Sequence, residues 1–365
     1  MRHIYDNIIS IENLLISWQE FLRGKKKRKD VAEFSVNFID NIVDLHRELK
    51  EKTYQHENYQ AFKINDPKPR DIHKATIRDR LVHHAIYRIL YPYFDRRFIS
   101  DSYSCRLNKG THRAVNRFRD FGRKVSKNNT RTCWILKCDI RKFFASIDHE
   151  ILKNILARHI EDENVLWLLW RVIDSFSTGL PLGNLTSQLL VNIYMNDFDQ
   201  FVKHDLMVKY YIRYADDFII FSEDKLYLEC LVVEMDVFLR QKLKLDLHPK
   251  KVFIKTLASG VDFLGWINFP NHRVLRTMTK KRIIRKLEKN SMPESVASYS
   301  GVLSHGNSYK LSAAINQKRV SEIGRGFQVV GTDRKVATSA QKRVIRLASY
   351  ILVLPAGLEP ATPTL

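Results

Sequence analysis

The chain has 365 residues, 44% of them apolar, which is enough to form cores for one large lobe or for two to three small ones. Its 61 Lys and Arg residues against 40 Asp and Glu leave a net charge of +21, which indicates a polyanionic partner and favours nucleic acid over a membrane. No apolar run approaches the roughly 20 residues of a membrane span, the N-terminus is not typical of a signal peptide, and the four cysteines lack disulfide or zinc spacing, so we expect a cytoplasmic protein.

Apolar residues recur at helical spacing in three segments of the N-terminal region. The basic run at residues 25–29 lies between the first two and is either a nucleic-acid contact, a nuclear address or a solvated loop. His83 and His84 are adjacent and cannot share one face of a helix, which argues against a metal pair at this point. The three predicted helices cover residues 1–22, 34–49 and 79–90.

The hydrophobic period changes in the middle of the chain, where an apolar run at residues 134–138 is followed by Asp139. This pattern predicts a buried strand that ends on a carboxylate. Asp148 precedes the next apolar segment and is expected to cap a helix, because its side chain can accept hydrogen bonds from free backbone N–H groups. Further along, we predict helices at residues 163–176 and 185–202, separated by a loop at 179–183.

Two β-rich runs, at residues 208–214 and 218–221, are separated only by Ala215-Asp216-Asp217. Short runs of this kind around a tight connection predict a β-hairpin with both aspartates at its tip. After the hairpin, we predict a helix at residues 227–242 and a pair of strands near 251–254 and 263–267.

The tip of this hairpin carries two adjacent carboxylates and no glycine. Tight hairpins usually turn on Asn-Gly or Asp-Gly, because the turn needs positive φ, and two like charges side by side cost stability unless a cation neutralises them. An isolated Asp-Asp pair is usually a solvated loop, but the flanking strand runs argue against that here. With Asp139 from a neighbouring strand, Asp216 and Asp217 would form a catalytic site for two Mg²⁺ ions about 3.5–4 Å apart, with Mn²⁺ as an alternative.

Two motifs carry a resemblance to a known family. Tyr214-Ala215-Asp216-Asp217 resembles the Y-x-D-D motif of reverse transcriptases, and residues 138–144 resemble the first palm motif of the same enzymes. The resemblance implies an α+β right-hand polymerase of fingers, palm and thumb, with an antiparallel palm sheet flanked by helices and a helical basic thumb. It also implies that the three aspartates are metal ligands in an RNA-directed DNA polymerase.

The same resemblance assigns further residues to the metal and nucleotide sites. The backbone carbonyl of Ile140 is implied as an additional metal ligand, and Phe144 takes the place of the gate that excludes a ribose 2′-hydroxyl; a simple core aromatic is the alternative. Residues 182–188 resemble the next motif, in which Gly183 lets the backbone approach nucleotide and template closely. Gln188, at the end of this motif, is a second candidate nucleotide contact.

Three other segments match motifs that handle the triphosphate and the primer. The His-Pro-Lys-Lys segment supplies a lysine that would protonate the leaving pyrophosphate; it is either Lys250 or Lys251, and we favour Lys251. Phe263-Leu264-Gly265-Trp266 resembles the primer grip. In the fingers region, Arg70 matches the arginine that contacts the triphosphate, and Lys63 is a second contact.

Two more basic positions follow the same region. Arg78 is either a nucleotide contact or the partner of Asp79 or Asp71. The Ser-Tyr-Ser-Cys-Arg segment resembles the one that follows the fingers in prokaryotic members, and Arg106 and Lys109 within it suit a template or phosphate contact.

We expect three lobes and a tail without regular structure. The composition shifts beyond Pro270, after which acidic residues become rare, and the last residues are rich in proline and without periodicity. The expected division is N-terminal helices and fingers at 1–133, palm at 134–269 with the motif loop and helix at 179–203, basic helical thumb at 270–349, and disordered tail at 350–365.

The expected thumb is the most basic part of the chain, with 17 Lys and Arg against 4 Asp and Glu between residues 270 and 349. Phosphate contacts from such a lobe would hold a duplex without reading its sequence; a merely solvated basic helix is the alternative. The expected nucleic-acid contacts are Lys280, Lys281, Arg282, Arg285, Lys286 and Lys289.

The motif after the gate indicates a branch of the family. Group II intron and retron enzymes usually have Gln-Gly and Ser-Pro there, whereas this chain has Leu182-Gly183 and Ser187-Gln188, as in reverse transcriptases of diversity-generating retroelements. That resemblance implies adenine-directed mutagenic copying of a repeat RNA into cDNA, in a prokaryotic cytoplasm. The implied partners are an RNA template, an RNA/DNA duplex, dNTPs and a small basic accessory protein oligomer.

Several alternatives remain open at this point. Defence-associated, retron-like and group II intron-like reverse transcriptases share the same motifs. An RNA-dependent RNA polymerase is disfavoured by the bulky Phe144, and an inactive RNA-binding scaffold is disfavoured because all three aspartates are in place.

Overall fold

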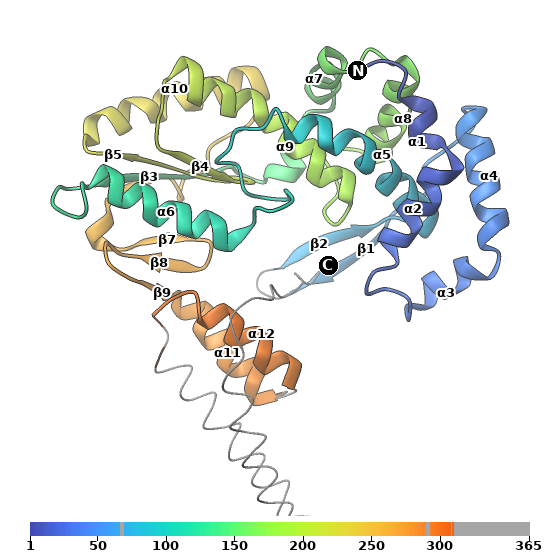
Figure 1. The fold of residues 1–365 in the computed structure, drawn as a ribbon. Coiled ribbons are helices and arrows are strands. Elements are labelled where there is room, and N and C mark those ends of the chain that lie inside the picture. Colours follow the sequence, from blue (N-terminus) through green and yellow to red (C-terminus); the bar gives the residue numbers. More distant parts are fainter. Residues whose placement is uncertain (66–68, 290–292, 308, 310–365) are drawn as a thin grey trace, which may run out of the picture. The chain divides into compact units, whose positions relative to one another are not determined.

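The computed structural model describes residues 1–65, 69–289, 293–307 and 309 and divides the chain into two compact units (Figure 1). The first unit ends at Ser259 and the second begins at Gly260, so the 263–266 hairpin belongs to the second unit and not to the unit that holds residues 134–259. The expected thumb residues 310–349 and the tail at 350–365 lie outside the described residues. Among the described residues, no helix is long and apolar enough to cross a membrane.

Five helices form the N-terminal part of the first unit (Figure 1). The helix predicted at residues 1–22 is divided at Ser10, whose ψ of 141° is not helical and whose Oγ accepts a hydrogen bond from the N–H of Asn13 at 3.1 Å. Ser10 therefore caps a second helix. Trp18 stacks on Phe38 with ring centroids 5.1 Å apart and ties this helix to the fourth. The helices are α1 Tyr5–Ile9, α2 Ile11–Phe21, α3 Lys29–Val36, α4 Phe38–Lys50 and α5 Ile77–Asp95.

Of the next five helices, the one at Thr111–Val125 was not predicted, and the other four lie close to their expected positions. Asp148 caps one of them as expected, because its Oδ1 accepts a hydrogen bond from the N–H of Ile151 at 3.0 Å. The helix predicted at 185–202 ends at Gln200 and continues as a π-helical turn, Phe201–Asp205. These helices are α6 Thr111–Val125, α7 His149–His159, α8 Glu163–Asp174, α9 Leu185–Gln200 and α10 Lys225–Leu243.

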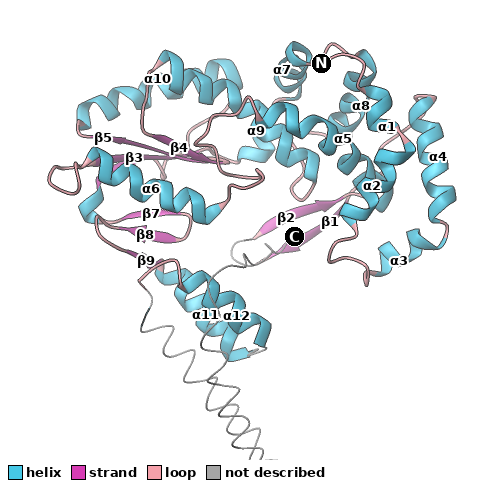
Figure 2. Cartoon of the chain, viewed as in Figure 1, coloured by secondary structure: helices cyan, strands magenta, loops and turns pink. Residues whose placement is uncertain are grey.

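A four-stranded antiparallel sheet, called the central sheet below, has strand order β4-β5-β3-β6 and lies between α6 and α10 (Figure 2). Because side chains alternate along a strand, Phe218 packs against Phe198 of α9 at 5.2 Å, whereas Phe221 meets Phe118 of α6 at 4.9 Å on the other face. Helices thus cover both faces of the sheet. The strands are β3 Trp134–Asp139, β4 Tyr211–Tyr214, β5 Asp217–Ser222 and β6 Phe253–Thr256.

The second unit contains a three-stranded antiparallel sheet and two helices. The strand pair expected near residues 251–254 and 263–267 was wrong: the first of these strands, β6, pairs with β3, and the second pairs with its own neighbours. A small core of Ile283, Leu287, Val296 and Leu303 joins the two helices. The elements are β7 Val261–Phe263, β8 Trp266–Asn268, β9 Arg273–Leu275, α11 Thr277–Lys289 and α12 Pro293–Leu303.

The packing around α5 makes stability depend on pH through His84. Burial and the neighbouring Lys25, Arg80 and Arg88 lower the pKa of His84 from 6.5 to about 4. The unfolded chain therefore binds this proton more readily, so the contribution of His84 to stability is complete above pH 6.5 and is lost as the pH falls towards 4. We expect His84→Gln to reduce the loss of unfolding free energy between pH 7 and pH 5 by about 1–2 kcal/mol. Urea denaturation at both pH values would test this, and equal losses in the two proteins would contradict it.

Candidate active site

The three predicted aspartates lie at one end of the central sheet. Asp139 is the last residue of β3 and Asp217 the first of β5, and the two are direct cross-strand partners. Asp216 occupies the turn between β4 and β5, and its carbonyl accepts a hydrogen bond from the N–H of Ile140 at 3.1 Å. The fold therefore brings all four predicted metal-site residues together.

The turn that carries Asp216 has an unusual backbone. Ala215 has φ of 54°, a left-handed conformation that residues with a Cβ adopt at a cost of roughly 1–2 kcal/mol. A glycine would adopt it without this cost. Tyr214, just before it, pairs with Asp217 across the hairpin, and its hydroxyl lies 3.2 Å from Thr111 Oγ1 of α6. Surrounding contacts therefore hold the strained turn in place.

The carboxylates raise one another's proton affinity. Burial and the nearby Asp139 raise the pKa of Asp216, against opposing contributions from Lys251 and Arg70. Burial also raises the pKa of Asp217 to about 6, with Asp216 and Asp139 adding to the rise and Lys137 opposing it. Because the site disfavours the charged forms of its carboxylates, a bound cation would stabilise them.

Lys137 and Lys251 supply part of the positive charge that the carboxylates need. Lys137 Nζ lies 2.9 Å from Asp217 Oδ2, and Lys251 Nζ lies 2.8 Å from Asp139 Oδ1. Lys250 makes no such contact through its side chain; its backbone N–H donates to His248 Nδ1 at 3.2 Å. The sequence did not decide between Lys250 and Lys251. Of these two, Lys251 is the one whose side chain contacts a carboxylate of the site.

The carboxylate oxygens are not all engaged. Asp217 Oδ1 is buried and has no hydrogen-bond partner. Within the described residues, however, no group of three or more His, Cys, Asp or Glu side chains is gathered closely enough to hold a metal ion. The donor set and the unpaired oxygen fit a divalent cation, and the side chains would need to converge further to bind one.

The candidate gate is built into a tight backbone contact. Phe144 lies in a 3₁₀ turn, Phe143–Ser146, and its carbonyl accepts a hydrogen bond from the N–H of Leu180 at 2.8 Å. Gly179 has φ of 68°, and a Cβ there would lie 2.3 Å from the same carbonyl oxygen. The position of Phe144 therefore depends on the glycine in the following loop.

The motif at residues 182–188 contacts a strand pair in the region that we expected to form the fingers. That pair consists of β1 Gln60–Ile64 and β2 Arg70–Lys74. The carbonyl of Leu182 accepts a hydrogen bond from the N–H of His73 at 3.1 Å, and a Cβ at Gly183 would lie 3.1 Å from Ile72 Cγ2. Gln188 lies in the first turn of α9, directly after this contact. Gly183 thus lies against the β1–β2 pair, and Gln188 follows it in the first turn of α9.

The predicted triphosphate contacts have different surroundings. Lys63 and Arg70 are exposed on β1 and β2, and Arg70 is near enough to oppose the rise in the pKa of Asp216. The Arg78 side chain instead forms ion pairs with Glu48 and Asp79, and a hydrogen bond joins it to the carbonyl of Gln55. Of the two roles considered for Arg78, these contacts favour the structural one, because its guanidinium is already engaged.

Arg106 and Lys109 are also engaged within the protein. Arg106 Nε lies 2.7 Å from Asp95 Oδ1, its Nη1 donates to the carbonyls of Ile99 and Ser102, and its side chain is only 5% exposed. Lys109 Nζ donates to the carbonyl of Ser100 at 2.7 Å. These contacts favour a structural role for Arg106 over the expected template contact, because its guanidinium is already bonded within the protein.

The predicted primer grip forms a two-residue hairpin between β7 and β8. Leu264 and Gly265 have φ of 50° and 87°, the signs that a type I′ turn requires. Phe263 and Trp266 pair across the strands and are buried, so the turn itself is the accessible part. The assignment to primer binding stays a prediction.

The basic side chains that we expected to contact nucleic acid lie on α11 of the second unit. Lys280, Lys281, Arg285 and Lys286 are exposed, whereas Arg282 is half-buried. The side chain of Lys289 lies outside the described residues. This exposed cationic face has the composition of a phosphate-binding surface.

Sequence reasoning missed two residues at the site, Lys137 and Arg213. Lys137 contacts Asp217, and Arg213 contacts the carbonyl of Ala215. Both are long cations inside apolar strand runs, and both are more than 90% buried. That pattern was the available signal, because a charged side chain is rarely buried without a partner.

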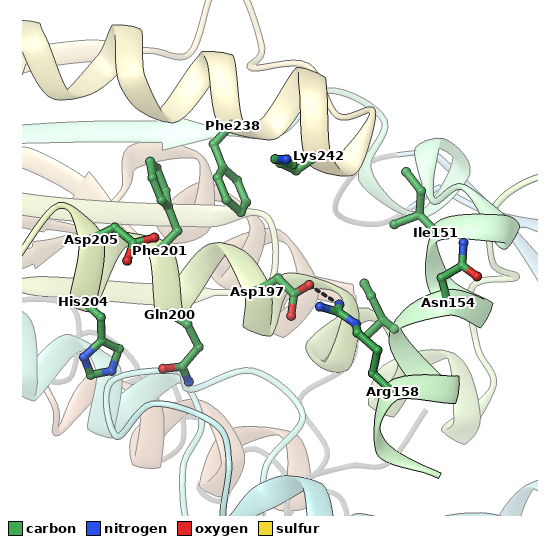
Figure 3. A pocket seen from close by; sticks show the side chains of 11 residues that line it. Ile151, Asn154, Arg158, Asp197, Gln200, Phe201, His204, Asp205, Phe238 and Lys242 are labelled. Atoms are coloured by element: carbon green, nitrogen blue, oxygen red, sulfur yellow. Dashed lines mark hydrogen bonds and ion pairs between the residues drawn. The ribbon is translucent and has the colours of Figure 1, made fainter. Parts of the chain in front are cut away.

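A separate pocket of about 560 Å³ lies between α7, the end of α9 and α10 (Figure 3). An ion pair between Arg158 and Asp197 spans it, and Phe201 stacks on Phe238 with centroids 4.2 Å apart (Figure 3). None of its lining residues belongs to the carboxylate site. The lining residues are Ile151, Asn154, Ile155, Arg158, Asp197, Gln200, Phe201, His204, Asp205, Phe238 and Lys242.

An antiparallel sheet that ends in carboxylates on the adjacent strands β3 and β5, with a Y-x-D-D turn joining β4 to β5, defines the palm of a template-directed polymerase. The model of the reverse transcriptase (RNA-dependent DNA polymerase) family matches residues 63–268. The chain belongs to this family, which confirms the expected enzyme class, RNA-directed DNA polymerase.

Individual proteins that resemble this chain share a low sequence identity with it. YkfC of Escherichia coli K12 is 25% identical over 273 residues, covering 62% of this chain and 70% of that protein. The group II intron-encoded protein LtrA of Lactococcus lactis subsp. cremoris is 25% identical over 345 residues, covering 73% of this chain and 55% of LtrA. Apo telomerase from Candida tropicalis superposes with a TM-score of 0.50 at 12% identity, over 63% of this chain and 49% of the telomerase chain. This likeness of fold agrees with the expected α+β right-hand class.

Proposed function

We propose that this chain synthesises DNA on an RNA template by a two-metal nucleotidyl transfer at Asp139, Asp216 and Asp217. The observation that carries the proposal is the direct cross-strand pairing of Asp139 with Asp217, with Asp216 in the adjoining turn. Three carboxylates at one sheet end attract divalent cations, and the raised pKa values of Asp216 and Asp217 indicate that positive charge is in demand there.

The proposed metals are two Mg²⁺ ions, with Mn²⁺ as a substitute. Asp139 and Asp216 would hold them together with Asp217 and the carbonyl of Ile140. When bound, the metals would supply activation of the primer 3′-hydroxyl and neutralisation of the leaving pyrophosphate. The buried, unpaired Asp217 Oδ1 supports this assignment, because a buried oxygen without a partner is costly.

Residues of the chain would position the nucleotide and move one proton. Arg70 and Lys63 of the exposed strand pair would bind the triphosphate through charge. Phe144, held by Gly179, would block a ribose 2′-hydroxyl. Lys251, already within hydrogen-bond distance of Asp139, would give its proton to the pyrophosphate as it leaves.

Primer extension on an RNA template tests the proposal. We expect efficient extension with dNTPs and poor extension with rNTPs, because Phe144 would clash with the 2′-hydroxyl. Phe144→Ala should raise rNTP use without abolishing dNTP use. Efficient rNTP use by the unmodified protein would instead support an RNA polymerase, and extension with neither would support a binding scaffold.

Lys251→Gln should slow extension by about 10²-fold, which is the usual contribution of a general acid. Lys250→Gln is the matched control, because it removes the neighbouring charge from a side chain that does not reach Asp139. Single-turnover rates at saturating dNTP would separate the chemical step from binding. Equal effects of the two substitutions would refute the assignment.

We further propose that the chain serves a diversity-generating retroelement. The Leu182-Gly183 and Ser187-Gln188 pairs support this branch, and an accessory basic protein oligomer would then be a partner. Similarity to LtrA favours a group II intron-like role as the second candidate. Inspection of the neighbouring DNA would separate them: a near-duplicate repeat differing chiefly at adenines would support the first, and an intron structure around the gene would support the second.

The exposed basic face of α11 would hold the RNA/DNA duplex through its phosphates. Lys280, Lys281 and Arg285 are exposed on it. Such contacts are independent of sequence and weaken with salt, as expected for an enzyme that must move along its template.

A further inference from the structure

An arginine is fully buried beneath the catalytic turn. Arg213 lies on β4, one position before Tyr214, and none of its surface is exposed. A buried guanidinium is tolerated only when it is paired and its N–H groups are bonded.

Three of its bonds anchor the side chain to α9. Arg213 Nε and Nη2 donate to the two carboxylate oxygens of Asp199 at 2.7 and 2.6 Å, a two-pronged pair in which neither side chain is exposed. Nη1 donates to Asn192 Oδ1 at 3.2 Å. Asp199 also accepts a hydrogen bond from the Tyr211 hydroxyl at 2.8 Å. The three bonds of Arg213 itself fix its guanidinium relative to the helix.

The remaining contact reaches the catalytic turn. Nη1 also donates to the carbonyl of Ala215 at 3.3 Å. Ala215 is the residue with the left-handed backbone, and its carbonyl belongs to the peptide that leads into Asp216. A charged donor on this carbonyl favours the one orientation of the peptide that the structure has.

The same hydrogen-bond network extends to Gln188, the last residue of the motif at residues 182–188. The Asn192 side-chain N–H₂ donates to the carbonyl of Ser104 at 3.0 Å and to the carbonyl of Gln188 at 3.2 Å. Asn192 therefore bonds both to Arg213 and to the first turns of α9. A continuous chain of hydrogen bonds joins Gln188 to Ala215 through buried groups.

We propose that Arg213 is a positioning residue that holds the Ala215–Asp216 peptide in its strained conformation, so that Asp216 is set for metal binding. The proposal rests on the proposed function, because it concerns the metal-binding role of Asp216. Asn192 and Asp199 act through Arg213, by fixing its guanidinium.

The test is the Mg²⁺ dependence of primer extension by the full chain. Arg213→Lys keeps the positive charge but loses the fork, and we expect the Mg²⁺ concentration for half-maximal rate to rise about tenfold, with little change in affinity for an RNA/DNA duplex. Tyr211→Phe is the matched control: it removes a hydrogen bond to Asp199 and leaves every Arg213 contact. It should keep the original Mg²⁺ requirement.

A rescue variant separates positioning from plain stability. Ala215→Gly allows positive φ without strain, so in the Arg213→Lys background it should restore most of the Mg²⁺ response. A loss of activity that follows thermal stability and is not restored by the glycine would overturn the proposal. So would an unchanged Mg²⁺ requirement in Arg213→Lys.

A failure of Arg213→Lys to fold and a lack of activity in the unmodified protein lead to different conclusions. If Arg213→Lys does not fold, Asn192→Ala keeps the Asp199 ion pair, and it should raise the Mg²⁺ requirement in the same direction by a smaller factor; no change would count against the proposal. If the unmodified protein extends no primer under any condition, the proposed function fails, and with it the premise of this inference.

Discussion

Asp216→Asn is expected to reduce primer extension at least about a thousandfold while leaving affinity for the RNA/DNA duplex within about twofold of the original. The amide keeps the size of the side chain but removes the negative charge that would hold the metals. Duplex binding should persist, because the proposed phosphate contacts lie on α11 and not at the turn. Single-turnover extension and a filter-binding titration at fixed salt would measure the two quantities.

Asp246→Asn is the matched control for this substitution. Asp246 is exposed, its side chain pairs with Arg240 at 3.4 Å, and surface pairs of this kind contribute little. Its extension rate should equal that of the unmodified protein. Synthesis retained in Asp216→Asn at more than a few percent would exclude Asp216 as a metal ligand.

The unfolding of metal-free protein offers a second measurement on the same variant. Burial and the adjacent Asp139 make the charged form of Asp216 costly in the fold. An amide at this position removes the cost, so Asp216→Asn should be at least as stable as the unmodified protein in the absence of divalent metal. Loss of activity could then not be attributed to unfolding.

The parts of the fold that the sequence predicted well depend on neighbours along the chain. The β3 strand that ends on Asp139, the β4–β5 hairpin and the cap at Asp148 all follow from local periodicity and from capping chemistry. The same local signals place each aspartate at or beside a strand end. The β3–β5 pairing that brings the three aspartates together joins strands distant in the chain, and the sequence indicated it only through the resemblance of its motifs to reverse transcriptases.

The parts that could not be predicted depend on partners distant in the sequence. Whether Arg78 and Arg106 face solvent was decided by Glu48 and Asp95, which no local pattern connects to them. The pairing of β6 with β3 rather than with β7 is likewise decided by tertiary packing and not by a local pattern. Ser10 is an exception, because a serine before Glu12 and Asn13 was a readable cap signal within the predicted first helix.

The roles of two buried cations, Arg213 and Lys137, could be inferred only from the sequence and the structure together. Arg213 and Lys137 interrupt apolar strands, which marks them as unusual, but the sequence does not say which acid each one meets. The fold supplies Asp199 for the first and Asp217 for the second. Exceptions to the binary pattern were therefore the informative positions, and they contact Ala215 and Asp217 of the Y-x-D-D segment.

Gly179→Ala is expected to lower the unfolding free energy by about 3 kcal/mol and to impair extension strongly. The added Cβ would lie 2.3 Å from the carbonyl oxygen of Phe144 and 2.6 Å from Ala145 Cα, and both are backbone atoms that cannot rotate away. The φ of 68° at Gly179 adds the cost of a left-handed alanine. The Phe144 turn must shift to relieve the clash, so the gate should move with it.

Gly24→Ala separates the cost of the left-handed backbone from the cost of the steric clash. Gly24 has nearly the same φ, 70°, but no atom within 4 Å of the added Cβ. It therefore carries the backbone cost alone, about 1 kcal/mol, and should leave extension unchanged. Urea unfolding of the two variants, together with their discrimination between dNTPs and rNTPs, would measure the contact between the loop and the gate. If both glycines cost the same and discrimination is unaltered, the loop does not position Phe144.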